Sequence, residues 1–122
     1  MDVTASSDGR GRYIVSCPEK MEWDARVDLV KAVDDAVDDA GATIILDLAN
    51  VTYANSAGLG AIFALRKHLV SSGGTLVLAR PTPPIRRLLE TTNVPALIPV
   101  SRSLDEARAV VEQAARPGED EA

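Results

Sequence analysis

The sequence predicts an α/β fold, a single domain in which a mixed β-sheet of four to five strands carries about four α-helices. The chain has 122 residues, of which 46% are hydrophobic, enough for one core and not for two. Only 3% are aromatic, so Val, Leu, Ile and Ala must fill that core. Strand-like and helix-like segments alternate with short connections. We expect the domain to span residues 11–115, between a flexible N-terminal segment (1–10) and an acidic C-terminal tail (116–122).

The first half of the chain contains two predicted strands and one predicted helix. Tyr13–Cys17 is rich in β-formers and stops at Pro18, and a weaker strand could precede it. From Asp24 to Ala40 apolar residues recur every three or four positions, and Gly41 follows, which predicts an amphipathic helix. Thr43–Leu48 is a nearly continuous apolar run, typical of a strand covered on both faces, so we place it centrally in the sheet.

A second helix is predicted after the turn at 50–54. Asn55 or Ser56 can cap its start, and apolar residues continue at helical spacing until Ser72. Thr75–Ala79 then predicts another strand.

The remaining elements are recognised by their boundaries. Thr82–Pro84 offers an N-cap followed by proline at the first helical position, which predicts a short helix. Leu97–Val100 can form only a short edge strand, because Pro99 has no N–H to donate. Ser103 with Glu106 three residues later is a capping box that opens the last helix.

Charge and cysteine content exclude several classes of function. The net charge of −5 provides no basic field for nucleic acid, and no apolar stretch is long enough to cross a membrane. The N-terminus lacks the pattern of a secretory signal, so we expect a cytoplasmic protein. A single cysteine, Cys17, and a single histidine, His68, permit neither an internal disulfide nor a zinc cluster, and we expect no cofactor and no metal.

The segment with the clearest functional content places a serine where a loop enters the second helix. Unpaired N–H groups and the positive end of the helix dipole at such a position would stabilise a phosphate on Ser56. Gly58 and Gly60 lack side chains on the first turn, which would let the backbone of another protein come close.

This strand, loop and helix, Ile44–Leu65, resembles the signature of the STAS family. The usual form is an apolar strand ending in Asp-Leu, followed by Asp-Ser-(Ser, Thr or Ala)-Gly-Leu-Gly. The later strand from Gly73 to Leu78 and the helix from Pro84 to Leu89 follow the family's order. The resemblance covers roughly residues 12–115.

The resemblance implies an anti-sigma-factor antagonist, a protein-binding module and not an enzyme. In the family, an anti-sigma factor that is also a serine kinase phosphorylates the position of Ser56 and then releases the domain, and a serine phosphatase can reverse the modification. We expect a monomer or a weak dimer. The residues expected to contact the partner are Asn55, Ser56, Ala57, Gly58 and Gly60, with Trp23 and Asp24.

Two departures from the family pattern keep a second function open. Asn55 replaces the usual acidic residue, and the stretch Pro18–Asp24 lacks the usual Gly and a clear equivalent of the usual Asp. These changes favour a STAS-like scaffold or regulatory subunit of a signalling or transport complex that is never phosphorylated. A small enzyme is the third reading, but the chain offers no catalytic triad, no paired catalytic carboxylates in an identifiable cleft and no P-loop.

Each singled-out residue also has an ordinary structural interpretation. A serine at this position is often only a helix cap, and His68 fits an exposed or half-buried helical residue. Arg86 and Arg87 fit surface charges, although they could meet an acidic patch on a partner.

Overall fold

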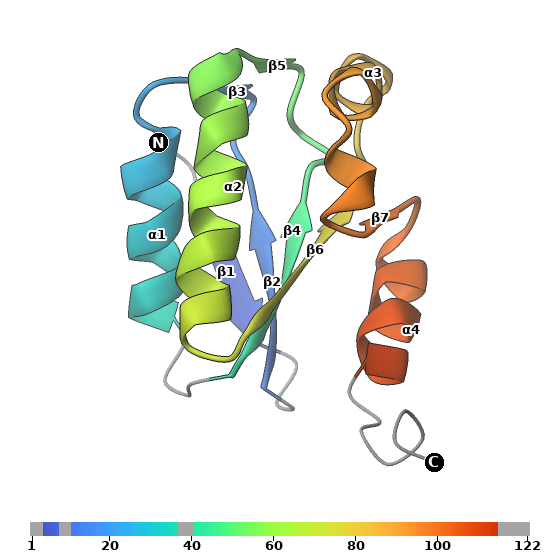
Figure 1. Cartoon of the computed structure of the whole chain (residues 1–122). Helices are drawn as coiled ribbons and strands as arrows, with labels where there is room; N and C mark the ends of the chain where they lie inside the picture. Colours follow the sequence, from blue (N-terminus) through green and yellow to red (C-terminus); the bar gives the residue numbers. More distant parts are fainter. Residues whose placement is uncertain (1–3, 8–10, 37–40, 115–122) are drawn as a thin grey trace.

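The computed structural model describes residues 4–7, 11–36 and 41–114, which form a five-stranded sheet with helices on both faces (Figure 1). The strands lie in the order β1 (Thr4–Ser7), β2 (Arg12–Ser16), β4 (Thr43–Asp47), β6 (Thr75–Ala79), β7 (Val100–Ser101). β1 is antiparallel to β2, and all other neighbours are parallel. The predicted mixed sheet is therefore confirmed, with the apolar β4 strand at its centre.

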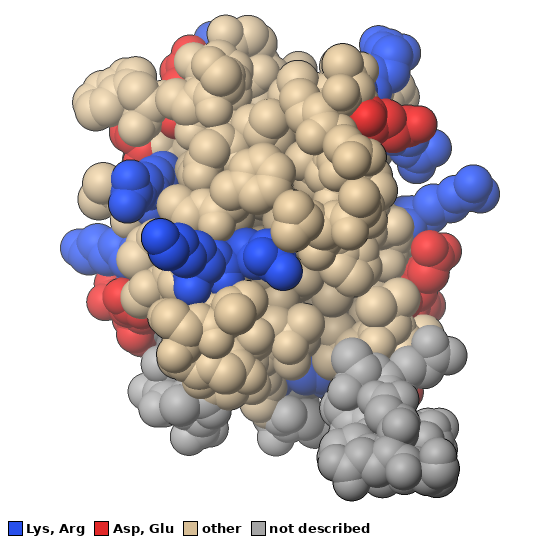
Figure 2. All heavy atoms as spheres, in the orientation of Figure 1, with Lys and Arg blue, Asp and Glu red and all other residues tan. Residues whose placement is uncertain are grey.

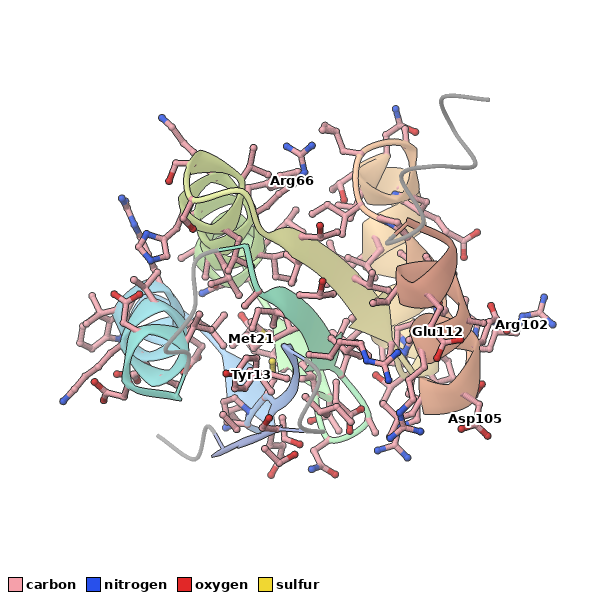
Figure 3. The ribbon with its side chains drawn as sticks, turned by 90° about the horizontal axis from the view of Figure 1, so that it is seen from below. Tyr13, Met21, Arg66, Arg102, Asp105 and Glu112 are labelled. Atoms are coloured by element: carbon pink, nitrogen blue, oxygen red, sulfur yellow. The ribbon has the colours of Figure 1, made fainter. Side chains whose placement is uncertain are left out.

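Four α-helices cover this sheet, as the sequence predicted. They are α1 (Ala25–Ala36), α2 (Ser56–Ser71), α3 (Pro83–Thr91) and α4 (Leu104–Ala114), with a short 3₁₀ helix η1 (Val94–Ala96) after α3. Figure 3 shows α1 and α2 on one side of the sheet and α4 on the other. The last part of the first predicted helix, residues 37–40, lies outside the described residues.

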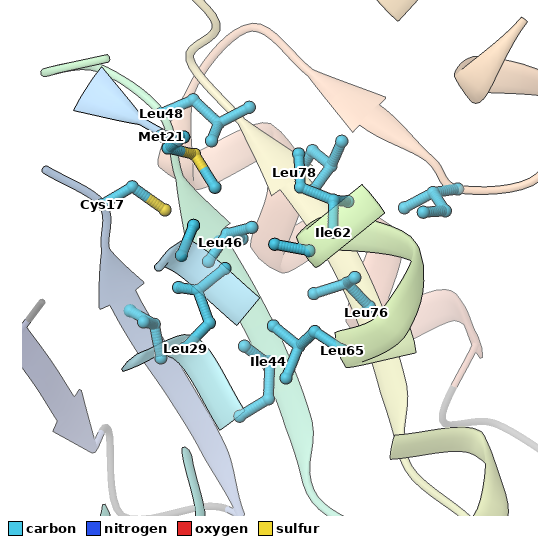
Figure 4. Packing of buried hydrophobic residues seen from close by; sticks show 14 of the residues in the cluster. Cys17, Met21, Leu29, Ile44, Leu46, Leu48, Ile62, Leu65, Leu76 and Leu78 are labelled. Carbon is cyan, nitrogen blue, oxygen red and sulfur yellow. The ribbon is translucent and has the colours of Figure 1, made fainter. Parts of the chain in front are cut away.

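The two faces of the sheet contribute to two hydrophobic clusters. Because successive residues of a strand point to opposite faces, Ile44 and Leu46 face α1 and α2, while Ile45 faces α4. Figure 4 shows the larger cluster, in which Leu29 and Leu65 pack against β4. Burial on both faces explains why the middle of β4, Ile44–Leu46, is apolar.

Two boundaries differ from the sequence prediction. The expectation of a flexible segment at 1–10 is wrong for Thr4–Ser7, which form β1, and the weaker strand suggested before Tyr13 is confirmed. The last strand is Val100–Ser101 and not Leu97–Val100, because the chain first forms η1 and proline at 99 cannot donate. The carbonyl of Pro99 still accepts a hydrogen bond from the Leu78 N–H at 2.9 Å. The tail at 116–122 lies outside the described residues.

The thiol of Cys17 is buried at the end of β2, with 1% of the residue exposed. Burial raises the pKa of this thiol above its ordinary value of 9.0, and the charge of Asp47 raises it further. Since the folded chain disfavours the thiolate, this group leaves stability unchanged below the ordinary pKa and lowers it as pH rises above that value.

We therefore expect Cys17 to resist alkylation in the native protein at mildly alkaline pH and to react fully once the protein is unfolded. Mass spectrometry after iodoacetamide treatment, with and without denaturant, measures this difference. Alkylation of the native protein at the rate of the unfolded chain would contradict the prediction.

Candidate functional site

Ser56 is the first residue of α2, at the point where the chain leaves the loop after β4. Asn55 is the N-cap: its backbone is extended, and its side-chain Oδ1 accepts a hydrogen bond from the Gly58 N–H at 3.0 Å. Ser56 is exposed, and among the described residues its hydroxyl has no hydrogen-bond partner. Asn55 therefore fills the capping role, and the hydroxyl of Ser56 is accessible from solvent.

A small two-stranded sheet holds the loop in front of α2. β3 (Lys20–Met21) pairs in parallel with β5 (Tyr53–Ala54), at the upper end of the molecule in Figure 1. The carbonyl of Glu19 accepts hydrogen bonds from the N–H groups of both Thr52 and Tyr53, and the Asn55 N–H donates to Met21. The stretch Pro18–Asp24, which departs from the usual family pattern, thus lies directly beside Ser56, the candidate phosphorylation site.

Gly58 has a different role from the one expected. It is buried, and a Cβ built at this position would lie 2.1 Å from the carbonyl oxygen of Met21. The missing side chain therefore makes room for the protein's own β3 strand, so the expectation that it makes room for another protein is wrong. Gly60 does leave open space, because no atom lies within 4 Å of a Cβ at that position.

The other predicted contact residues occupy two separate places. Ala57 and Gly60 are exposed on the first turns of α2, beside Ser56. Trp23, with 82% of the residue exposed, and Asp24, which is partly buried, lie at the start of α1. Within the described part of the chain, no hydrogen bond or ion pair joins Trp23 or Asp24 to Ser56.

The surface around Ser56 has no formal charge on α2. The first ten residues of the helix contain no charged side chain, and the first cations along it are Arg66 and Lys67. Figure 2 shows this as a mostly uncharged upper region with a band of basic side chains below it. A charge added at Ser56 would therefore lie on a part of α2 that otherwise carries no charge.

An ion pair between Asp47 and Arg80, which the sequence does not predict, stabilises the start of the loop between β4 and α2. Asp47, with 6% of the residue exposed, accepts hydrogen bonds from Arg80 at 3.1 and 2.5 Å and from the Ala49 N–H at 3.1 Å. The hydrogen bond to Asp47 is the main cause that raises the pKa of Arg80. The hydroxyl of Thr82 donates to the carbonyl of Val51 at 2.6 Å, so the start of α3 is tied to the same loop.

Arg80 could not be recognised from the sequence because it lies 33 residues after its partner. It also has a positive φ of 55°, a conformation that is rare for residues other than glycine. In this conformation the side chain of Arg80 pairs with Asp47, and its backbone N–H donates a hydrogen bond to the carbonyl of Ser101 at 2.9 Å.

We expect Arg80→Ala to lower the free energy of unfolding by about 1–3 kcal/mol, because it leaves the buried Asp47 carboxylate without its cation. The expected loss of stability is smaller than for a fully buried ion pair, since the Arg80 side chain is 44% exposed and water can replace part of its interaction with Asp47. Urea denaturation measures the change. Arg87→Ala, which removes an exposed cation on α3, serves as the control and should change stability by less than about 0.5 kcal/mol. Equal losses in both variants would contradict the role given to Arg80.

The remaining singled-out residues fit their structural interpretations. His68 is exposed on α2 and lies 2.8 Å from the Asp34 carboxylate on α1. Arg86 and Arg87 are exposed on α3. Residues 4–7, 11–36 and 41–114 contain no group of three potential metal ligands, and no helix in these ranges is long and apolar enough to cross a membrane.

Comparison with known proteins agrees with this geometry. A model of the STAS domain family matches residues 13–107. BtrV of Bordetella bronchiseptica, named as a candidate anti-sigma factor antagonist, is 32% identical over 78 residues, which are 64% of this chain and 67% of that protein.

Several solved structures share the fold. An anti-sigma factor antagonist from Mycobacterium paratuberculosis is 25% identical, with a TM-score of 0.71 over 91% of this chain and 95% of that one. The unphosphorylated form of the Bacillus anti-sigma factor antagonist SpoIIAA is 18% identical, with a TM-score of 0.69 over 92% of this chain and 97% of that one. SpoIIAA has also been solved in a phosphorylated form, with a TM-score of 0.62, 17% identity and coverage of 90% and 99%.

The family match spans the sheet from β2 onward and the helix that carries Ser56, and relatives of this chain are named as anti-sigma factor antagonists. The protein belongs to the STAS domain family, as the strand, loop and helix around Ser56 predicted.

Proposed function

We propose that this protein is an anti-sigma factor antagonist that binds an anti-sigma factor with serine kinase activity through the start of α2. Phosphorylation of Ser56 by that partner ends the complex, and a serine phosphatase restores it. The protein then regulates sigma-factor-dependent transcription in the cytoplasm by protein binding and not by catalysis.

The observation that carries this proposal is the free hydroxyl of Ser56. Asn55 supplies the helix cap, so the neighbouring serine is not needed for it. The hydroxyl is exposed at the N-terminal end of a 16-residue helix, where the dipole favours a phosphate.

The chemistry of the surface explains how one phosphate can act as a switch. Exposed small residues, Ala57 and Gly60, border Ser56, and α2 contributes no charge there. A partner that fits this surface closely must exclude water from it. A phosphate on Ser56, with a charge of about −1.5 to −2, would have to lose its water in such a complex. Because removing water from this charge is costly, the complex would dissociate.

Mass spectrometry of the intact protein tests the modification. The protein is incubated with Mg-ATP and each candidate anti-sigma factor kinase from its source cell, and we expect the addition of one phosphoryl group. Ser56→Ala should remain unmodified. Ser103→Ala is a matched control, because Ser103 is also an exposed serine at the start of a helix, but its hydroxyl accepts from the Glu106 N–H at 3.0 Å.

Two results would count against the proposal. One is an unchanged mass of the wild-type protein with every candidate kinase, and the other is phosphorylation of Ser56→Ala at the wild-type level. A pull-down from the source cell with and without ATP identifies which candidates bind.

The second candidate function is a STAS scaffold that is not phosphorylated. Asn55 favours it, because the surface lacks the acidic residue that precedes the serine in the usual family pattern. A stable stoichiometric complex that forms equally with and without ATP, together with an unmodified Ser56, would support this reading.

A further inference from the structure

Two aromatic side chains of this chain are exposed near Ser56. The sequence has one Trp, two Tyr and one Phe. Tyr13 is buried, and Phe63 packs against the larger hydrophobic cluster. Trp23, in contrast, is 82% exposed, and Tyr53 is 47% exposed. Half of the aromatic residues are therefore left in contact with solvent, although aromatic side chains are the largest apolar groups that a chain can bury.

The pairing of β3 with β5 turns the side chain of Tyr53 outward. In the parallel register Lys20 lies opposite Tyr53, and Met21 lies opposite Ala54. Paired residues point to the same side of a sheet, and successive residues point to opposite sides. Met21 is buried and Ala54 is half-buried, so these two point inward, whereas Lys20 and Tyr53 point to solvent. The Tyr53 N–H also donates to the carbonyl of Glu19 at 3.2 Å, so a hydrogen-bonded backbone holds the phenol ring outward.

Trp23 is presented by the turn between β3 and α1. The carbonyl of Glu22 accepts a hydrogen bond from the Ala25 N–H at 3.1 Å, which closes this turn around Trp23. Two residues before Trp23, the carbonyl of Met21 accepts a hydrogen bond from the Asn55 N–H at 3.3 Å. The turn that carries the indole is thus attached to the N-cap of α2.

Both aromatic residues lie close enough to Ser56 to be covered by one partner. Tyr53 comes three residues before Ser56, so their Cα atoms are at most about 11 Å apart. The Cα of Trp23 lies within about 7 Å of the Met21 carbonyl oxygen, and hence within about 10 Å of the Asn55 nitrogen. A standard interface covers about 800 Å² on each partner, which is a disc of about 16 Å radius. A contact of this size centred on Ser56 therefore includes Trp23 and Tyr53.

The two rings lie on different sides of the start of α2. Trp23 directly precedes the first turn of α1, whereas Tyr53 is in β5, which contacts α3. Figure 1 shows α1 on one side of α2 and α3 on the other, with β5 and the starts of α1 and α2 at the same end of the molecule. The start of α2, which carries Ser56, thus lies between the two exposed rings.

We propose that Trp23 and Tyr53 are the anchors through which the anti-sigma factor binds this chain, with Ser56 between them. This inference rests on the function proposed above, because a kinase that phosphorylates Ser56 must cover the surface around it. Trp and Tyr are among the residues that most often dominate the binding energy of an interface, since each combines a large apolar ring with one polar group. The partner that fits has two apolar pockets, and each pocket contains a hydrogen-bond acceptor, one for the indole N–H and one for the phenol O–H.

The anchors and the serine have separate roles in this interface. The rings are uncharged, and phosphorylation of Ser56 leaves them unchanged, so they determine which protein binds. Residues that dominate binding cluster near the centre of an interface, where water is excluded most completely. A phosphate between the two anchors would lie in this centre, and binding of both rings would require removal of its water. The rings therefore select the partner, and Ser56 determines whether the partner stays bound.

Isothermal titration calorimetry, with the partner identified by the pull-down from the source cell, measures the contribution of each ring. Trp23→Ala and Tyr53→Ala should each weaken binding by about tenfold to 100-fold, because each leaves a pocket of the partner unfilled. Tyr53→Phe, which keeps the ring, should bind within a few-fold of the wild type. Val70→Ala is the control: Val70 is 53% exposed but lies 14 residues after Ser56, about 21 Å along α2, and this variant should bind like the wild type.

Fluorine NMR tests whether Trp23 itself contacts the partner. Because Trp23 is the single tryptophan, incorporation of 5-fluorotryptophan gives one resonance. Addition of the unlabelled partner should shift or broaden this resonance, whereas the same addition to the Ser56→Asp variant should leave it unchanged. The resonance of the isolated protein should not depend on its concentration. A shift with concentration alone would show that the indole contacts a second copy of the chain, and this would overturn the proposal.

The binding results separate this proposal from the function proposed for Ser56. If Ser56→Asp loses binding while both aromatic variants bind like the wild type, the anchors are wrong and the function of Ser56 stands. If the aromatic variants lose binding while Ser56→Asp and Ser56→Ala bind equally well, the anchors stand and the phosphorylation switch is wrong. Equal losses in Val70→Ala and the aromatic variants would overturn the anchors, and a pull-down that recovers no partner would overturn both proposals.

Discussion

Replacing Gly58 by alanine is expected to lower the free energy of unfolding by about 3 kcal/mol or more. The new methyl group would lie 2.1 Å from the carbonyl oxygen of Met21 and 2.7 Å from its carbonyl carbon. These are backbone atoms of β3, so no side-chain rotation relieves the clash. Either β3 moves away from β5 or the first turn of α2 shifts, and both movements disrupt the hydrogen bonds that hold the loop before Ser56.

The change is measured by urea denaturation and by thermal melting, in which we expect a decrease in Tm of roughly 10 °C or more. Gly60→Ala is the matched control, two residues away on the same helix, with nothing within 4 Å of its added Cβ. It should raise stability by about 0.5–1 kcal/mol, because alanine is the better helix former. Similar effects of the two substitutions would show that contact with Met21 does not constrain position 58.

The contrast between these two glycines illustrates what the sequence could and could not predict. Helical spacing and a capping residue placed both of them on the first turns of α2, since these signals depend on neighbouring residues. Whether a Cβ has room depends on Met21, which lies 37 residues earlier in the chain. The sequence contains no signal for that contact, so both glycines received the same interpretation.

The same distinction applies to the fold. The apolar run of β4 and the Ser103 cap of α4 are local patterns, and both were predicted correctly. The second half of the predicted capping box differs, because the Glu106 carboxylate accepts from the Arg102 N–H at 3.5 Å and not from the Ser103 N–H. β3 and β5 have two residues each, too few to show any alternation, and they form only because they pair with one another. β1 consists of Thr-Ala-Ser-Ser, which has no strand pattern of its own and is a strand because β2 offers a free edge.

In the candidate site, too, local signals could be predicted and contacts between residues far apart in the chain could not. Ser56 could be identified from local signals, because a strand, a loop and a helix cap follow one another in sequence. Arg80 could not, because its pairing with Asp47 depends on β4 and β6 lying side by side with their carboxyl ends together. The residues that position this loop are therefore distributed over the chain, while the residue proposed to be modified lies within the motif.

Ser56→Asp is expected to weaken binding of the anti-sigma factor by about 100-fold or more, whereas Ser56→Ala should bind within a few-fold of the wild type. The carboxylate introduces a charge into a surface to which α2 contributes none, and a close-fitting partner must remove water from that charge without compensation. Removal of the hydroxyl loses little, since it makes no hydrogen bond within the described residues. Isothermal titration calorimetry with the partner recovered by the Ser56→Ala protein measures both affinities.

Ala57→Asp separates an effect of the surface from an effect of residue 56 alone. Ala57 is exposed and adjacent, on the same uncharged turn, so a carboxylate there should weaken binding to a similar degree even though it cannot mimic a phosphorylated serine. Lys67→Ala, a change of charge three turns further along α2, should alter affinity by only a few-fold. If Ser56→Asp and Ser56→Ala bind equally well, the partner does not cover the start of α2. If Ser56→Asp alone is impaired while Ala57→Asp binds normally, the partner reads residue 56 through a specific contact and not through exclusion of charge from the surface, and the desolvation argument for the switch is wrong.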